Sequence, residues 1–168
     1  MKSIFTKITF FCLSVTWSSC LYAHGTIIFP NVEHGDGYID VKIYDSKESF
    51  SNNDFEFGKF HIINIWASWC LPCKAELPFL MDLKNNSPEL TILGFNHKDK
   101  RDDAIEFLST NGNPYSFVGV DSDGMIGFKF GVFGLPETFL TNNQGKIIYK
   151  HIGPLTNKVI QKEILPNL

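Results

Sequence analysis

A chain of 168 residues with 43% hydrophobic and 20% charged residues has the size and composition of a single globular domain. Its formal net charge of −3 provides no basic excess, which argues against a nucleic-acid partner. The sequence shows no internal repeat or low-complexity tract.

Residues 1–23 are predicted to be an export signal. A positive start with two lysines, a short apolar run at residues 8–17 and a small residue at Ala23 follow one another, as in cleaved signals. One alternative is an uncleaved membrane anchor, although the run is shorter than the ~20 residues that span a bilayer. Another is lipid attachment at Cys20. Cleavage would leave Cys70 and Cys73 as the cysteines of an exported protein.

Residues 24–59 are predicted to form an N-terminal elaboration of the domain. Glycine and proline mark loops there, and the alternation of apolar residues over 38–44 predicts a strand. The scattered His24, His34 and His61 are interpreted as surface or capping residues rather than as metal ligands.

The stretch from Ile62 to Pro78 organises the rest of the chain. It begins as an apolar run typical of a buried strand and continues through Cys70-Leu71-Pro72-Cys73 into a helix. A Cys-x-x-Cys between a strand and a helix is typical of a thiol–disulfide redox site. The helix N-terminus stabilises a thiolate, so the first cysteine becomes a usable nucleophile near neutral pH.

The alternative for this motif is a structural metal site, because a Cys-x-x-Cys is also half of many zinc sites. Such a site needs two more ligands, and Cys12 and Cys20 are expected to leave with the signal. A Cu(I) chaperone that uses the cysteines with a nearby histidine such as His97 is a further alternative. The favoured prediction is a redox site without a metal, whose only redox group is a Cys70–Cys73 disulfide.

The periodicity of residues 60–168 predicts an α/β domain, in which a sheet has helices on both faces. Turn residues separate the elements, and Pro78 predicts a kink in the first helix. The predicted elements are helices over 72–85 and 102–110, strands over 90–95 and 115–120, a short helix and loop over 124–134, a strand hairpin over 137–141 and 146–151, and a helix over 155–165.

The stretch from about Phe60 to Leu155 resembles the thioredoxin superfamily, and within it the exported thioredoxin-like proteins of cytochrome c maturation, the CcmG/DsbE type. Four motifs carry this resemblance: Asn64 to Cys70 with Cys73, Gly94 to Asp99, Gly112 to Tyr115, and Gly131 to Thr138. The resemblance implies a thioredoxin-like fold with a central mixed β-sheet. Residues 24–60 depart from it, because they lack the Pro-x-Phe opening that this type has before its first core strand.

The resemblance also implies roles for single residues. Cys70 would attack a client disulfide, Cys73 would resolve the mixed disulfide, and Pro136 would be a cis-proline lying against the pair. The residues expected to border the docking groove for a client are Trp69, Leu135 and Glu137.

Glu76 lies one helical turn after Cys73, and the resemblance matches it to an acid beneath the cysteine pair. It would take the proton from Cys73 during resolution. The alternative for Glu76 is a first-turn glutamate that the helix dipole stabilises, and the alternative for Glu137 is an exposed strand-edge residue. Acids near a sulfur disfavour the thiolate, which is consistent with a protein that gives electrons.

These features predict a periplasmic thiol:disulfide oxidoreductase that reduces an apocytochrome c, or a chaperone that holds it, before haem attachment. Haem attachment at Cys-x-x-Cys-His needs two free thiols, which an oxidising compartment tends to oxidise to a disulfide. The resemblance implies a membrane protein that passes electrons outward to this one. The alternative is a general exported thiol–disulfide reductase or oxidase without a dedicated cytochrome client.

Overall fold

The computed structural model describes residues 41–42, 49–50, 60–143 and 145–168. The predicted export signal with its alternatives, and most of the predicted N-terminal elaboration, therefore lie outside the described residues. Within the elaboration, two short strands are described, β1 (Val41–Lys42) and β2 (Ser49–Phe50), which pair antiparallel.

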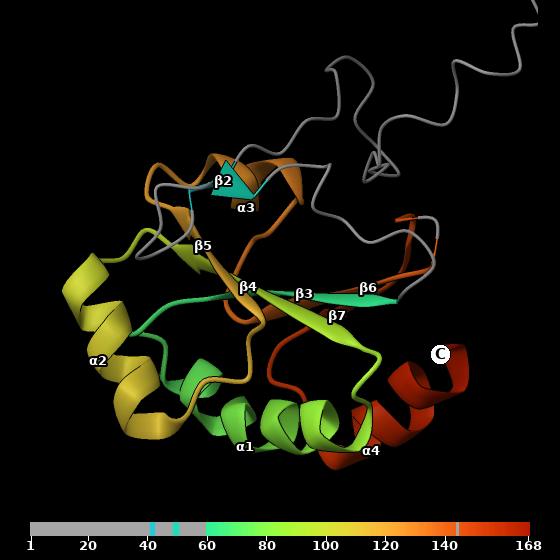
Figure 1. Ribbon diagram of the computed structural model, residues 1–168. Coiled ribbons are helices and arrows are strands. Elements are labelled where there is room, and N and C mark those ends of the chain that lie inside the picture. The colour runs from blue at the N-terminus through green and yellow to red at the C-terminus, as the bar shows by residue number, and fades with distance from the viewer. Residues whose placement is uncertain (1–40, 43–48, 51–59, 144) are drawn as a thin grey trace, which may run out of the picture.

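A five-stranded mixed sheet in the order β5-β4-β3-β6-β7 forms the centre of the described domain (Figure 1). Strands β3, β4 and β5 are parallel to one another, whereas β6 is antiparallel to both β3 and β7. The central mixed sheet that the family resemblance implies is thus confirmed. The strand bounds are β3 (His61–Trp66), β4 (Thr91–His97), β5 (Phe117–Asp121), β6 (Glu137–Thr141) and β7 (Ile147–Ile152).

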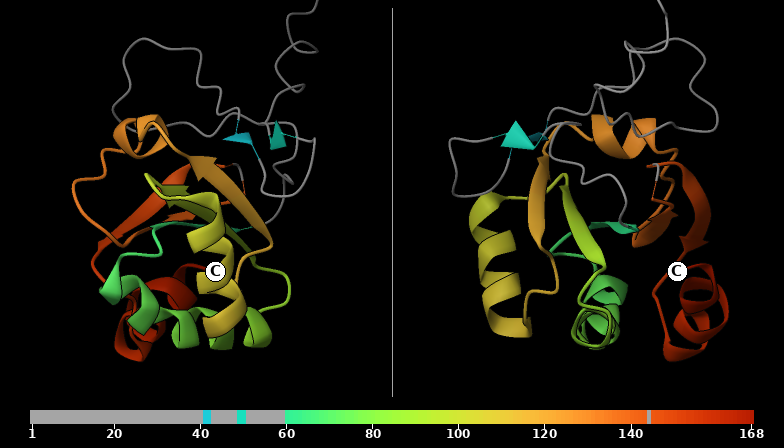
Figure 2. Two further views of the ribbon diagram at one scale, coloured as in Figure 1. Left: turned by 90° about the vertical axis from the view of Figure 1, so that its left-hand side faces the viewer. Right: turned by 45° about the vertical axis from the view of Figure 1, so that its right-hand side comes forward.

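Helices cover both faces of this sheet, as expected. Figures 1 and 2 show α1, α2 and α4 on one side and α3 on the other. No helix in the described part of the chain is long and apolar enough to cross a membrane. The helix bounds are α1 (Leu71–Asn86), α2 (Arg101–Asn111), α3 (Met125–Lys129) and α4 (Asn157–Val159), which continues as a π-helical turn (Ile160–Ile164) and a 3₁₀ turn (Leu165–Asn167).

The alternation of side chains along the strands produces two hydrophobic cores, one on each face of the sheet. Because both faces of the sheet are covered, the sequences of its central strands are nearly continuous apolar runs. Register pairs place Ile62, Ile92 and Leu140 on the face of α1, and Ile63, Leu93 and Phe139 on the face of α3.

Most predicted element bounds are within one or two residues of the observed ones, and β6 is matched at both ends. The final helix begins at Asn157 rather than at Leu155, because the Leu155 N–H donates to Glu76 and the Thr156 hydroxyl caps the helix. Strands β6 and β7 form the expected hairpin, and Gly145 in its turn has a φ of 77°, which suits glycine.

The interpretation of His61 as a surface or capping residue is wrong. Its side chain is buried, because β3 is the middle strand of the sheet. The His61 backbone N–H donates to Thr141 Oγ1 over 3.2 Å, and the ring Nδ1 lies 3.5 Å from the same hydroxyl. This histidine therefore joins the start of β3 to the end of β6.

Candidate active site

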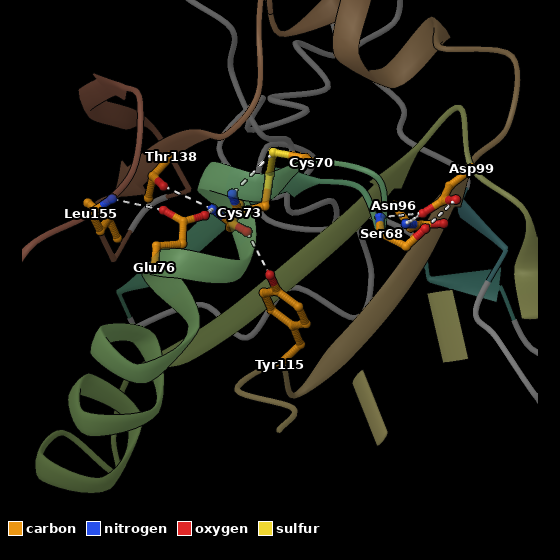
Figure 3. Close-up of a disulfide and its surroundings, with 10 residues drawn as sticks. Ser68, Cys70, Cys73, Glu76, Asn96, Asp99, Tyr115, Thr138 and Leu155 are labelled. Carbon is orange, nitrogen blue, oxygen red and sulfur yellow. Dashed lines mark hydrogen bonds between the residues drawn. A yellow bond between two sulfur atoms is a disulfide. The ribbon is translucent and has the colours of Figure 1, made fainter. Parts of the chain in front are cut away.

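Cys70 and Cys73 form a disulfide at the N-terminus of α1 (Figure 3). Cys70 is the N-cap residue of the helix, and its Sγ accepts a hydrogen bond from the Cys73 N–H over 3.2 Å. Both residues are nearly buried, at 5% and 1% exposure, so a partner has access only to an edge of the pair. Cys70 has the larger exposed fraction, which suits the attacking role predicted for it.

The turn that leads into Cys70 is held by Asp99, for which the sequence analysis assigned no role. The Cys70 N–H donates to the Ala67 carbonyl over 3.2 Å and closes the turn. Inside the turn, Ser68 donates twice to the Asp99 carboxylate, from its backbone N–H (2.6 Å) and from its hydroxyl (2.8 Å) (Figure 3). Asp99 follows β4, the parallel neighbour of β3, and the ends of parallel strands meet at one edge of a sheet. The position of Asp99 after the strand that neighbours β3 is therefore the feature of the sequence from which its contact with Ser68 could have been predicted.

Trp69 and Leu71 give Cys70 an apolar and exposed border. Trp69 is 62% exposed and Leu71 is 77% exposed. The Trp69 indole is nevertheless fixed, since its Nε1 donates to the Lys98 carbonyl over 3.2 Å. An exposed but fixed aromatic ring is a suitable surface for an incoming polypeptide. The binding role of Trp69 stays a prediction.

Glu76 lies beneath the disulfide with no exposed surface (Figure 3). Burial raises the pKa of Glu76 from 4.5 to about 7, although hydrogen bonds from the Leu155 N–H (2.9 Å) and from Asn64 Nδ2 (2.8 Å) oppose the shift. The alternative interpretation as a first-turn residue is wrong, because α1 begins at Leu71 and its first turn holds no acid. A carboxyl group with a pKa near 7 can accept or release a proton at neutral pH.

Three further polar residues form a hydrogen-bonded group with Glu76, and the sequence analysis assigned a role to none of them, although each belongs to a motif that carries the family resemblance. Asn64 of β3 donates to Glu76 and also to Thr138 Oγ1 (3.1 Å), while its Oδ1 accepts from the Tyr115 hydroxyl (2.7 Å). Burial, together with the charge of Glu76, raises the pKa of Tyr115. The feature of the sequence that could have indicated this group was Asn64 itself, a polar residue in the run from Ile62 to Trp66 that is otherwise apolar.

The Leu135–Pro136 peptide bond is cis, which confirms the expected cis-proline. Pro136 is buried and directly precedes β6. Because the β3–β6 ladder begins at Ile65 and Glu137, Pro136 lies at the end of β3 from which the chain continues to Cys70. Leu135 is half-buried and packs against both hydrophobic cores. The structure therefore brings this turn to the same end of the sheet as the cysteine turn, and the docking role of Leu135 stays a prediction.

Glu137 is not an exposed strand-edge residue. It is fully buried and its register partner, Ile65, belongs to the core on the α3 face, opposite to Glu76. Its Oε1 accepts from the Phe133 N–H over 2.9 Å, and Lys150 Nζ lies 2.7 Å from its Oε2. A docked protein cannot touch this carboxylate directly, so any binding role would act through the loop before Pro136.

His97, the histidine of the copper alternative, is engaged elsewhere. Its Nδ1 contacts Asp121, whose carboxylate also accepts the backbone N–H groups of Ile126 and Gly127 in α3. Within the described residues, no group of three or more potential metal-ligating side chains is arranged to hold a metal ion. His97 thus joins the end of β4 to α3.

Comparison with known proteins shows the family to which the chain belongs. A model of the family described as Redoxin matches residues 28–165. The chain belongs to the Redoxin family. Proteins of known structure show the same thioredoxin-like fold, so the expected fold is confirmed. They include a putative thiol:disulfide interchange protein DsbE from Chlorobium tepidum (TM-score 0.67, 24% identity, 77% of this chain, 92% of that one) and a putative thioredoxin from Neisseria meningitidis (TM-score 0.67, 22%, 77% and 87%).

Curated relatives of this Redoxin chain share 41–45% of aligned residues with it and confirm the likeness to the CcmG/DsbE type. They include the thiol:disulfide interchange proteins CycY of Rhizobium leguminosarum (41% over 109 residues, 65% of this chain and 58% of that one), DsbE of Yersinia pestis (45% over 109 residues, 65% and 57%) and HelX of Rhodobacter capsulatus (44% over 119 residues, 71% and 66%). The chain thus spans 57–66% of the length of these relatives.

Proposed function

We propose that this protein is a thiol:disulfide oxidoreductase that works outside the cytoplasm and reduces a disulfide of apocytochrome c, or of a chaperone that holds it. The observation that carries the chemistry is the Cys70–Cys73 disulfide at the start of α1, above a buried carboxyl group with a pKa of about 7. The names of the curated relatives, all thiol:disulfide interchange proteins, support the reaction class.

The exchange starts from the reduced protein. The Cys70 thiolate attacks one sulfur of the client disulfide, that S–S bond breaks, and the other client sulfur leaves as a thiolate. Cys73 then gives its proton to the Glu76 carboxylate and attacks the Cys70 sulfur. The bond between Cys70 and the client breaks, so the client has gained two electrons and the Cys70–Cys73 disulfide has formed.

The buried Glu76 supports an exchange in which the client is reduced and this protein is oxidised. A carboxylate close to the cysteines disfavours the thiolate, and therefore the reduced form, of the protein. A strong oxidant needs the opposite arrangement, because it works by stabilising its reduced form. After each turnover a membrane protein that carries electrons outward would reduce the disulfide again. No cofactor besides the cysteine pair enters this scheme.

The cytochrome client rests on the chemistry of haem attachment and on the family resemblance. Attachment of haem at Cys-x-x-Cys-His requires both thiols, and an oxidising compartment tends to join them. Trp69 and Leu71 offer an apolar border at Cys70 for such a polypeptide. The same geometry would also suit a general exported reductase, which is the alternative function.

Deletion of the gene is expected to remove covalently attached c-type cytochromes, because their haem-binding cysteines stay oxidised. Haem staining of membrane and exported fractions measures this loss, and external thiol should restore the cytochromes. A gene copy with Cys70→Ala is the matched control and should not complement the deletion. If the deletion left cytochrome levels normal while other exported proteins became wrongly oxidised, the protein would instead be a general exported reductase.

The mature protein is expected to begin near His24 outside the cytoplasm. The order of charge, apolar run and small residue over 1–23 motivates this proposal. Intact-mass analysis of the protein from its native host would locate the first residue. A mass that retains Met1 to Ala23 would instead indicate an anchor, and an added lipid mass at Cys20 would indicate a lipoprotein.

A further inference from the structure

Tyr115 has no part in the exchange steps, yet its hydroxyl begins a buried chain of hydrogen bonds that ends at Glu76 (Figure 3). The hydroxyl donates to Asn64 Oδ1 over 2.7 Å, and Asn64 Nδ2 donates to Glu76 Oε1 over 2.8 Å. All three residues are buried. Both donors point toward the carboxyl group, which is the arrangement that a negative charge on Glu76 favours.

The ring of Tyr115 reaches Asn64 because β4 leaves space for it. Gly94 is the register partner of Asn64, and a Cβ atom on Gly94 would lie 2.6 Å from the Tyr115 ring. The ring also stacks on Trp66 with centroids 5.5 Å apart. The position of the hydroxyl is thus fixed by packing, independently of its hydrogen bond.

We propose that Tyr115 is a positioning residue for Glu76: by donating to Asn64 it holds the NH₂ end of that amide toward the carboxylate. A carboxylate can only accept, so Asn64 must present its NH₂ group and turn its carbonyl away. That carbonyl is buried and needs a donor, which the Tyr115 hydroxyl supplies. The proposal rests on the proposed function, in which ionised Glu76 accepts the proton of Cys73.

Without the Tyr115 hydroxyl, the protonation equilibrium of Glu76 shifts toward its protonated form. The buried Asn64 carbonyl would lose its donor, and an amide whose carbonyl is unpaired is a weaker donor to a carboxylate. Protonated Glu76 could supply the missing donor from its own O–H once the amide turned over. The described groups that face Glu76 are the titratable Cys73 and Tyr115 and the neutral Asn64, Thr138 and Leu155 N–H.

The test is Tyr115→Phe, which keeps the ring and its stacking. In the oxidised protein the cysteines do not titrate, so NMR of the Glu76 carboxyl carbon follows this one group. We expect its titration midpoint to rise by about half a unit to one unit, the effect of one lost hydrogen bond that favours the ionised form. Tyr149→Phe, which removes the hydroxyl of a half-buried tyrosine on β7, should leave the midpoint unchanged. An unchanged midpoint in Tyr115→Phe overturns the proposal.

A measurement on the wild-type protein does not depend on the folding of any variant. The Asn64 side-chain amide protons should change their chemical shifts with the same midpoint as the Glu76 carboxyl carbon, and shifts that stay constant overturn the proposal. The role of Glu76 in the proposed function and the positioning role of Tyr115 are tested by different measurements. If Glu76→Gln leaves resolution unaffected, Glu76 is not the proton acceptor, whereas the coupling of Tyr115 to Glu76 is decided by the NMR midpoint alone.

Discussion

Cys73→Ala protein is expected to accumulate mixed disulfides with its client, whereas Cys70→Ala protein is expected to form none and to lose exchange activity. Cys70 lies at the N-cap, where the helix dipole stabilises a thiolate, and it has the larger exposed fraction of the pair. Cys73 is almost completely buried behind it, so it reaches the Cys70 sulfur but not a client. Removing Cys73 therefore leaves attack intact and stops resolution.

Non-reducing electrophoresis and mass spectrometry after incubation with a disulfide-bonded Cys-x-x-Cys-His peptide would measure both outcomes. The double variant Cys70→Ala/Cys73→Ala is the matched control for non-specific capture. Adding dithiothreitol should release the peptide trapped by Cys73→Ala. If both single variants trapped the peptide equally, the assignment of attacking and resolving cysteine would be wrong.

The parts of the molecule that the sequence predicted depend on local patterns. The strand β3, the helix α1 and the cysteine pair at the start of this helix follow from an apolar run, a helical period and a Pro72 that suits the first turn. The closeness of Glu76 to Cys73 also follows from helical spacing alone. The cis bond at Pro136 was accessible only through the family resemblance, because a local pattern predicts no more than a turn there.

The parts that could not be predicted depend on contacts between distant segments. Tyr115 lies 51 residues from Asn64 and Leu155 lies 79 residues from Glu76 along the chain, and their contacts require the register of the sheet and the packing of the C-terminal segment. The alternative interpretation of Glu137 as an exposed strand-edge residue is wrong for a related reason. A charged residue on a strand usually faces solvent, but here Lys150 and the N–H of Phe133 satisfy the buried carboxylate.

Glu76→Gln is expected to remove a pH dependence of folding stability. The folded-state pKa of about 7 lies above the ordinary value of 4.5, so between these values the unfolded chain has lost the proton that the folded protein still holds. The stabilising contribution of protonated Glu76 is complete below pH 4.5 and is lost as the pH rises through 7. A shift of this size corresponds to about 3 kcal/mol. Urea unfolding of the oxidised wild type and of Glu76→Gln at pH 4 and pH 8 isolates this group, because all other titrations are common to both proteins.

The same substitution is expected to slow resolution of the mixed disulfide, because the buried Cys73 thiol loses its proton acceptor. The loss should be about 10²-fold or more above pH 7, where the wild-type carboxylate is ionised, and should shrink toward pH 5. Stopped-flow measurement of peptide release between pH 5 and 9 gives both profiles, and Glu106→Gln on the exposed face of α2 is the control. Identical profiles would return Glu76 to a structural role. A buried acid that lowers stability by about 3 kcal/mol at neutral pH is poorly explained by structure alone, whereas a proton acceptor at this position requires the pKa that burial produces.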